Sequence, residues 1–243
     1  MNLKVLGSNS KGNCYLLEGK EETLMIECGV NIKKIKQALN FDFSKVVGCV
    51  VSHEHLDHAV SIPDLTRLGV NVYATAGTFN GFKSNRAKCI TTLEEFQIGG
   101  FKILAFDVKH DAREPVGFLI NHKECGNVLF LTDTFYCSYT FKNLNNIIIE
   151  ANYSKAIIDR KMREGESPEF LRNRILKSHL SLENCKKALK ANDLSGVNHI
   201  ILIHLSNGNS DEVQFQREVY ELTGKNVSVA NVGMDIPFNK TSF

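Results

Sequence analysis

Ser52-His53-Glu54-His55-Leu56-Asp57-His58 is the stretch of this chain that decides the fold. It places three histidines and two carboxylates within six residues, directly after the apolar run 46–51. That run is short and rich in β-branched residues, which predicts a buried strand ending just before the histidines. The i, i+2 spacing of His53 and His55 directs both imidazoles to one side of an extended segment. One metal ion rarely needs so many donors from so short a stretch, so the pattern indicates two metals.

Length and composition are those of an ordinary globular protein. The 243 residues, 43% hydrophobic and 23% charged, fit one domain spanning 1–243 with a sizeable core. A net charge of +2 provides no strong overall attraction to nucleic acid or membranes. No apolar stretch approaches membrane-spanning length, and the N-terminus turns polar too early for a signal peptide. We therefore expect a cytoplasmic protein that has no membrane partner. The sequence does not indicate its oligomeric state.

The seven cysteines do not suggest a zinc site or a disulfide framework. Their number is odd, and none is spaced Cys-x-x-Cys. We expect reduced, mostly buried thiols, as in a reducing compartment.

Hydrophobic periodicity predicts strands in two batches, each followed by helices. Strands are expected at 3–6, 14–17, 23–27, 46–51, 70–74, 95–108, 116–121, 128–132, 146–150, 200–203 and 227–230. Helices are expected at 32–39, 60–68, 168–177, 182–191 and 211–223, and a polar loop at 7–13. This order indicates one α/β domain of layered sheets with outer helices.

Three further residues at predicted strand ends have the same character as the histidine cluster. His110 follows the run 101–108, Asp133 ends the strand at 128–132, and His204 ends the strand at 200–203. Ligands at several strand ends converge on one edge of a sheet. Nitrogen and carboxylate donors without thiolates suit zinc, manganese or iron. His122 and His199, beside polar residues at strand edges, are interpreted as ordinary surface imidazoles.

The motif His53-x-His55-x-Asp57-His58 resembles the signature of the metallo-β-lactamase fold, a four-layer αββα sandwich with a two-metal site at one edge. The resemblance covers nearly the whole chain. It implies that one metal is bound by His53, His55 and His110, the other by Asp57, His58 and His204, with Asp133 bridging. Glu27 stands where the family has an aspartate that supports loops. Its longer side chain is therefore expected to alter the local geometry more than the metal binding.

The second half resembles the YycJ (WalJ) group, bacterial and phage proteins regarded as DNA exonucleases. The resemblance rests on Glu150-Ala151-Asn152, His179-Leu180-Ser181, His204-Leu205-Ser206 and the segments 7–14 and 110–117. The layout is also similar to tRNase Z, in which a histidine before a helix assists catalysis. That gives His179 the catalytic role and His204 the ligand role. No arm for gripping tRNA is apparent, and the short stretch between Asp133 and His179 leaves no room for a second domain.

The predicted activity is that of a dinuclear-metal phosphodiesterase, most specifically a DNA exonuclease. Two divalent ions (zinc or manganese) would activate a bridging hydroxide as the nucleophile. Asp57 and His179 are the predicted catalytic residues, and a protonated His179 would stabilise the transition state or protonate the leaving oxygen. Ser181 is a good N-cap, which puts His179 beside a helix N-terminus that favours phosphate. Substrate contacts are predicted at Ser8, Asn9, Ser10, Asn13 and Ser181.

Three alternatives remain open at this point. The first is a phosphodiesterase acting on cyclic phosphates or nucleotides, which would need no extended basic groove. The second is a lactone, thioester or β-lactam hydrolase, against which the histidine beside a helix N-terminus argues mildly. The third is a catalytically silent metal-binding scaffold, although the chain retains Asp57, Asp133 and His179.

Overall fold

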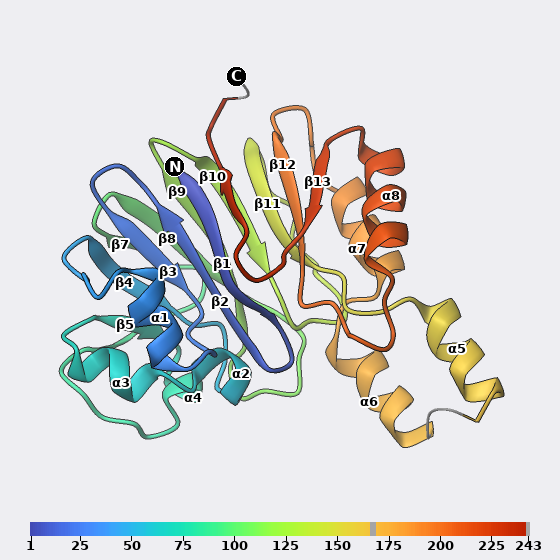
Figure 1. Cartoon of the computed structure of the whole chain (residues 1–243), viewed down its shortest axis with the longest axis horizontal. Coiled ribbons are helices and arrows are strands. Elements are labelled where there is room, and N and C mark those ends of the chain that lie inside the picture. The colour runs from blue at the N-terminus through green and yellow to red at the C-terminus, as the bar shows by residue number, and fades with distance from the viewer. Residues whose placement is uncertain (166–168, 242–243) are drawn as a thin grey trace.

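Two β-sheets pack face to face in the computed structural model, which describes residues 1–165 and 169–241 (Figure 1). Within these residues each sheet has seven strands, in the orders β14-β1-β2-β3-β4-β5-β6 and β13-β12-β11-β10-β9-β8-β7. The first sheet consists of β1 (Asn2–Asn9), β2 (Gly12–Glu18), β3 (Thr23–Ile26), β4 (Val46–Val50), β5 (Val72–Ala74), β6 (Ala87–Cys89) and β14 (Asp235–Pro237). The second consists of β7 (Glu95–Ile98), β8 (Phe101–Asp107), β9 (Val116–His122), β10 (Gly126–Leu131), β11 (Leu144–Glu150), β12 (His199–Ile203) and β13 (Asn226–Val229).

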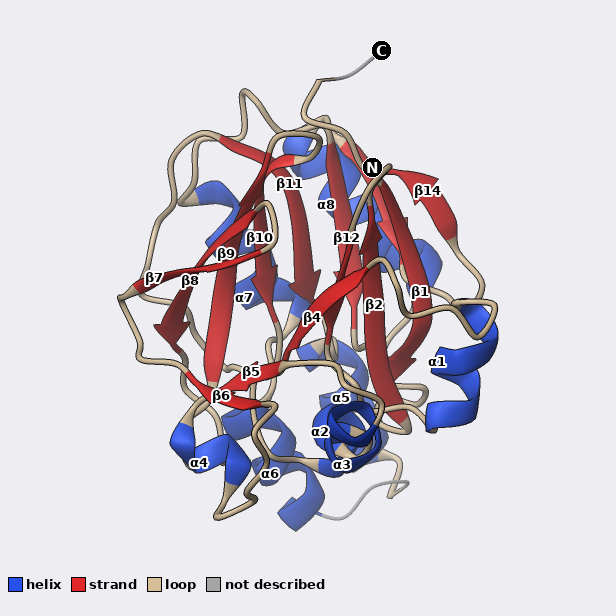
Figure 2. Ribbon diagram, turned by 90° about the vertical axis from the view of Figure 1, so that its left-hand side faces the viewer, coloured by secondary structure: helices blue, strands red, loops and turns tan. Residues whose placement is uncertain are grey.

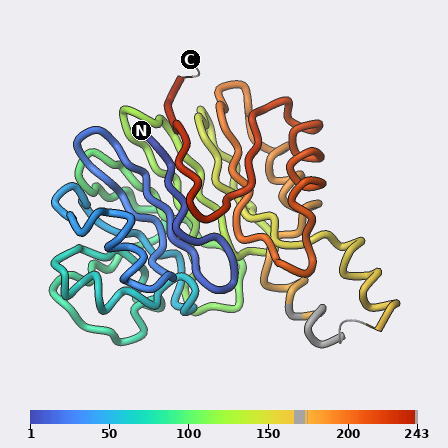
Figure 3. The backbone as a smooth tube through the Cα atoms, in the orientation of Figure 1, coloured from blue at the N-terminus to red at the C-terminus, as the bar shows by residue number. Residues whose placement is uncertain are grey.

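Helices flank both sheets, which confirms the predicted α/β sandwich (Figure 1). They are α1 (Ile32–Ala38), α2 (Leu56–Ala59), α3 (Ile62–Arg67), α4 (Ala76–Phe79), α5 (Lys155–Arg163), α6 (Glu169–Ser178), α7 (Leu182–Lys190) and α8 (Glu212–Thr223). Figure 3 follows the chain from blue to teal through the first six strands of one sheet, and then from green to red through the other sheet before β14 returns to the first. Both termini lie at the same end of the sandwich. None of the described helices combines the length and apolar character needed to cross a membrane.

The core explains why the strands read as uninterrupted apolar runs. In β11, Ile148 packs between the two sheets, while Ile147 and Ile149 pack on the opposite face among residues of α7 and α8. All three side chains are fully buried. A strand buried on both faces needs apolar residues at every position, and each such side chain contributes about 1.5–3 kcal/mol.

Strand direction brings the functional segments to one end of the sandwich. Strands β10, β11 and β12 run parallel, so their carboxyl ends lie at the same edge of the second sheet. Strand β4 is parallel to β3 and leads into the histidine motif and α2. Figure 2 shows α2, α5 and α6 gathered below the strands at this end, away from both termini.

One prediction near the site is wrong. The segment 7–13 is not a loop, because β1 and β2 continue through it as a hairpin that pairs Asn9 with Gly12. The helix predicted at 60–68 is α3, and a separate short helix, α2, precedes it from Leu56, so Asp57 and His58 are helical. The helix predicted at 168–177 is α6, although Pro168 lies outside the described residues. Five short or polar elements match no predicted range, namely α2, α4, α5, β6 and β14.

His122 is not a surface imidazole. Its side chain is buried, stacks on Phe101 with ring centroids 4.4 Å apart, and lies 3.1 Å from Glu22 Oε1. His122 ends β9, and its polar neighbours along the chain are typical of a surface segment. The sequence therefore gives no sign that this side chain is buried. His199 is half-buried, with Nε2 2.9 Å from Ser228 Oγ.

Candidate metal centre

The first histidine group forms where β4 leads into α2. His53, His55 and His110 bring ligand atoms close enough to hold one metal ion. Ring centroids are 4.6 Å apart for His53 and His55, and 4.7 Å for His53 and His110. His110 reaches this group from the loop after β8, where its Nε2 lies 3.2 Å from His55 Nδ1. The adjacent histidines of the motif and a histidine far along the chain therefore converge.

The outward nitrogens of this group are held by the protein. His53 Nδ1 lies 2.9 Å from Ser52 Oγ, and His110 Nδ1 donates to the Ser178 carbonyl at 2.7 Å. Such contacts set the tautomer and ring orientation of metal-binding histidines. His53 Nε2 is buried and has no hydrogen-bond partner among the described residues. A buried orphaned nitrogen is costly unless something binds it, and a metal ion fits that requirement.

The second group consists of Asp57 and His58 from α2 and His204 from the end of β12. Both imidazoles approach the same carboxylate oxygen, because His58 Nε2 and His204 Nε2 each lie 3.4 Å from Asp57 Oδ2. Their other nitrogens face buried carboxylates: His58 Nδ1 lies 3.5 Å from Glu27 Oε2, and His204 Nδ1 lies 3.1 Å from Glu150 Oε1.

Asp133 lies beside both groups. Its Oδ2 is 3.0 Å from His58 Nε2, and its Oδ1 is 3.4 Å from His204 Nδ1. It also forms a third compact set of donor atoms with His53 and His58. Burial raises the pKa of the Asp133 carboxyl, but the neighbouring imidazoles of His204 and His58 outweigh it and hold this pKa well below its usual range. The buried oxygens are therefore anionic, as a metal ligand must be.

Three residues of the centre have a strained backbone. Glu27, Asp133 and His204 follow strands β3, β10 and β12 and have φ angles of 62°, 46° and 54°. Residues with side chains rarely adopt this left-handed conformation, which costs about 1–3 kcal/mol each and persists where the surrounding structure imposes it. The strain turns each side chain sharply out of its strand toward the cluster.

His179 is held by two carboxylates. Its Nδ1 lies 2.7 Å from Glu150 Oε1 and 3.0 Å from Asp133 Oδ1, and Glu150 Oε2 accepts a hydrogen bond from the Leu180 backbone at 3.0 Å. Burial lowers the pKa of His179, but Glu150 and Asp133 outweigh it and raise this pKa to about 10. With Nδ1 occupied, Nε2 is the nitrogen left for a ligand.

Comparisons with known proteins identify the family of the chain. The sequence profile of the Beta-lactamase superfamily domain matches residues 23–205, most of the chain. The chain belongs to the metallo-β-lactamase superfamily. It is 28% identical to "Exodeoxyribonuclease YycJ" of Bacillus anthracis, over 86% of this chain and 84% of that protein. It is 29% identical to "Exodeoxyribonuclease WalJ" of Streptococcus pneumoniae serotype 2, over 96% and 91%. The crystal structure of the metallo-β-lactamase fold protein YhfI from Bacillus subtilis superposes with a TM-score of 0.71 at 15% identity, covering 97% of this chain and 98% of that one.

This metallo-β-lactamase superfamily hydrolase has a cavity on the His204 side of the centre. The cavity has a volume of about 310 Å³. It is lined by Ser10, Asn152, Ile175, Ser178, His179, His204, Leu205, Ser206 and Asn209. Most of these side chains are small and polar, which suits hydrogen bonding to a sugar or phosphate.

Of the five predicted substrate contacts, Ser10 lines this cavity, and Ser8, Asn13 and Ser181 have intramolecular partners. Ser8 Oγ accepts hydrogen bonds from Tyr15 and from the His204 backbone. Asn13 is buried and donates to the Asp57 carbonyl at 3.2 Å. Ser181 caps α7 by accepting from the Asn184 backbone, as its N-cap prediction requires. Asn9 accepts from Lys11 N at the hairpin turn.

Sequence reasoning assigned no role to Glu150 and Asn152. Glu150 is fully buried and holds both His179 and His204, while Asn152 donates from Nδ2 to the His204 carbonyl at 2.7 Å. The available signal was an acid at the end of an otherwise apolar strand, Ile147-Ile148-Ile149-Glu150. A carboxylate is rarely buried at such a position unless it is paired.

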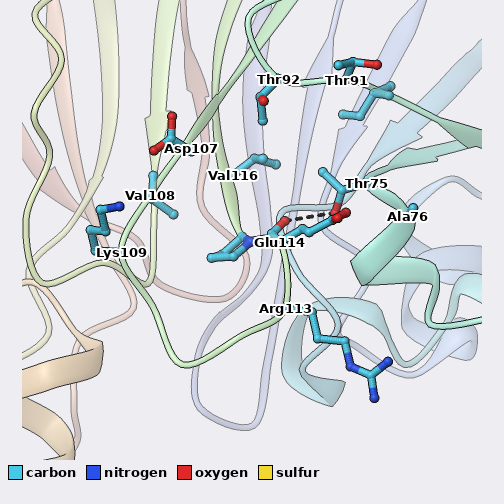
Figure 4. Close-up of a pocket in the computed structure, with 12 residues that line it drawn as sticks. Thr75, Ala76, Thr91, Thr92, Asp107, Val108, Lys109, Arg113, Glu114 and Val116 are labelled. Atoms are coloured by element: carbon cyan, nitrogen blue, oxygen red, sulfur yellow. Dashed lines mark hydrogen bonds between the residues drawn. The ribbon is translucent and has the colours of Figure 1, made fainter.

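A larger cavity of about 450 Å³ lies on the His110 side (Figure 4). Its apolar lining includes Val108 and Val116, and Lys109 and Arg113 come from the loop that carries His110. Figure 4 shows Thr75 bonded to the Glu114 carbonyl opposite Val108 and Lys109, with Arg113 directed away below. Cationic residues therefore lie on both sides of His110 along the chain.

Proposed function

We propose that this hydrolase is a dinuclear-metal phosphodiesterase that acts as a DNA exonuclease. Two relatives that align with more than four-fifths of the chain carry the name exodeoxyribonuclease. The observation that carries the proposal is the pairing of a metal-ligand cluster with His179, which two carboxylates hold by Nδ1. Phosphodiester cleavage needs an acid to protonate the leaving oxygen, and His179 is oriented to provide it.

His53, His55 and His110 would hold one ion, Asp57, His58 and His204 the other, and Asp133 would bridge them. The orphaned Nε2 of His53 and the concentration of buried carboxylates support this assignment, because both require cations. Two divalent ions, zinc or manganese, would supply Lewis-acid stabilisation of the phosphate and a bound water of lowered pKa. The carboxylate of Asp57, which approaches both imidazoles of its group, would keep the second ion in place.

Glu150 positions His179 without touching substrate. A buried carboxylate that accepts from Nδ1 keeps the proton on that nitrogen and stabilises the imidazolium, so that Nε2–H is available as the acid. After proton transfer the neutral ring retains its hydrogen bond to Glu150. The acid is thereby held in one orientation through the reaction.

The 310 Å³ cavity would bind the nucleotide on the His179 side of the cut. Ser10, Ser206 and Asn209 offer hydrogen bonds to sugar and phosphate oxygens. Lys161 of α5 adds positive charge near the cavity, because its Nζ lies 3.3 Å from where a Cβ at Gly208 would be, and Gly208 adjoins Asn209 of the cavity lining. A cavity of limited size at this point suits a terminal nucleotide, as an exonuclease requires.

The test is digestion of end-labelled single-stranded and duplex DNA by protein supplied with manganese or zinc. Stepwise shortening from an end is expected, whereas internal cuts or an unchanged label contradict exonuclease activity. His179→Ala should retain two metals by elemental analysis and lose at least about 100-fold in rate, the usual contribution of a general acid. His199→Ala, a half-buried histidine outside the cluster, is the matched control. If His179→Ala retains full activity, His179 is not the acid.

The same assay separates the alternatives. A phosphodiesterase of small molecules would hydrolyse a nitrophenyl phosphodiester and leave DNA intact. Turnover of lactones or thioesters, without turnover of either phosphodiester, would indicate carboxylic ester chemistry. A metal-loaded protein inactive on all of these substrates would be a scaffold.

A further inference from the structure

The loop after Asp133 exposes two adjacent aromatic rings beside the metal centre. Phe135 and Tyr136 follow Asp133 by two and three residues, and their exposed fractions are 40% and 56%. Large aromatic side chains stabilise a protein most when they are buried. Two adjacent exposed rings beside a functional site therefore indicate a ligand-binding surface. Nothing in the local sequence marks them as exposed, because they lie within an apolar and aromatic segment.

Hydrogen bonds hold this loop in one conformation. Phe135 N donates to the Lys109 carbonyl at 3.2 Å, and Asn184 Nδ2 donates to the Phe135 carbonyl at 2.9 Å. The buried hydroxyl of Thr134 donates to the Tyr136 carbonyl at 2.7 Å and accepts from Lys109 N at 3.0 Å. The loop is thus attached both to the segment that carries His110 and to helix α7. Rings on a fixed loop bind a flat ligand with little loss of conformational freedom.

Positive charge lies on both sides of the rings. Lys109 is exposed and adjoins His110, and its backbone contacts Phe135. Lys187 is exposed on α7 three residues after Asn184, and residues at this spacing share a helix face. Exposed aromatic rings between cations are the pattern with which proteins bind single strands, where bases stack on rings and ammonium groups contact phosphates.

We propose that Phe135 and Tyr136 form a stacking platform for an unpaired nucleobase next to the phosphodiester at the metal centre. The inference rests on the proposed function and specifies its substrate as single-stranded nucleic acid or a frayed end. The bases inside a duplex stack on one another and present no free face to a protein ring. A base stacked on these rings would lie beside the bound phosphodiester, because the loop begins at Asp133 and is hydrogen-bonded to Lys109, the neighbour of His110. Lys109, whose carbonyl accepts from Phe135 N, also lines the cavity in Figure 4, which leaves space for the strand to continue.

The test measures KM and kcat of the full, metal-loaded chain on single-stranded DNA. Tyr136→Ala should raise KM roughly 5- to 150-fold, the equivalent of the usual 1–3 kcal/mol per stacked base, with a smaller change in kcat. Tyr136→Phe should restore binding, because stacking needs the ring and not the hydroxyl. Tyr220→Ala, which removes a ring that is 57% exposed on α8, is the control and should leave KM unchanged. Thermal unfolding of each variant checks that the fold is retained.

Substrates with one abasic nucleotide, moved position by position from the cut, identify the stacked base. At one position the wild type and Tyr136→Ala should have equal KM values, because there is no base for the ring to hold. An unchanged KM for Tyr136→Ala on intact DNA, or a loss of the same size at every abasic position, overturns the platform. Hydrolysis of a small nitrophenyl phosphodiester should be unaffected by Tyr136→Ala. If the wild type does not cut DNA, the proposed function itself fails, and the platform with it.

Discussion

Glu150→Gln is the perturbation that tests the acid assignment most directly. The substitution preserves shape but removes the negative charge that lies 2.7 Å from His179 Nδ1. A hydrogen bond to a charged partner stabilises by about 1.5–3 kcal/mol, against about 0.5–1.5 kcal/mol for a neutral one. The imidazolium should therefore lose about 1–2 kcal/mol of stabilisation, which corresponds to a 5- to 30-fold fall in the fraction of protonated His179, and so in kcat, at pH values above its pKa.

The same loss predicts a change in pH dependence. The free energy of about 1–2 kcal/mol corresponds to about one pKa unit. Glu150 contributes most among the groups that raise the pKa of His179 to about 10, so its removal should lower that pKa. The acid must be protonated to act, so activity falls as pH rises through this pKa. The alkaline limb of kcat should consequently move to lower pH by about one unit in Glu150→Gln.

The assay is a pH–rate profile with metal content measured for each sample. Glu22→Gln is a matched control, because Glu22 pairs with the buried His122 at 3.1 Å outside the metal centre and its loss should leave the profile unchanged. An unchanged kcat and alkaline limb in fully metal-loaded Glu150→Gln would refute the positioning role. A loss that disappears when excess metal is added would instead assign the effect to His204, the other imidazole that Glu150 contacts.

Three further outcomes are expected. Asp133→Asn should weaken metal binding at least roughly 100-fold by metal titration, because this carboxylate contacts His58 and His204 of the second group and forms a compact donor set with His53 of the first. Unchanged stoichiometry at low metal would contradict its bridging position. Metal-free protein should unfold at lower temperature as pH rises from about 6.5 toward 10. Neighbouring carboxylates outweigh burial and raise the pKa of His204 to about 9 and that of His179 to about 10, so the protons that stabilise the folded state are lost over this pH range. A melting temperature that does not change with pH would contradict this prediction. Gly29→Ala should lower the free energy of unfolding in urea by about 3 kcal/mol or more and displace Asp57, because an added Cβ would lie 1.6 Å from the Asp57 carbonyl oxygen. A variant with wild-type stability and metal content would refute this reasoning.

Much of the fold was readable because its strands are buried on both faces. Runs such as Ile147-Ile148-Ile149 leave one interpretation, and their order along the chain indicates layered sheets with outer helices. Short or polar elements were not predicted. One of them is α5, in which Ile158 is the buried residue, so the helix has no extended apolar pattern. The hairpin through 7–13 was read as a loop because its polar residues are typical of a turn, while pairing across β1 and β2 overrides that local preference.

The sequence by itself determined the histidine motif and which strands end in a histidine or an acid. His53, His55, Asp57 and His58 are neighbours along the chain, so their closeness follows from the sequence alone, whereas His110 and His204 join them through the fold. Tertiary structure decided what surrounds them, because those contacts join segments far apart in sequence. The pairing of Glu150 with His179 depends on β11 lying beside β10 and β12, and the commitment of Ser8 and Asn13 to internal partners depends on how the sheets meet. A sequence shows that a residue ends a strand, whereas the order of strands in the sheet decides which other strand ends lie beside it.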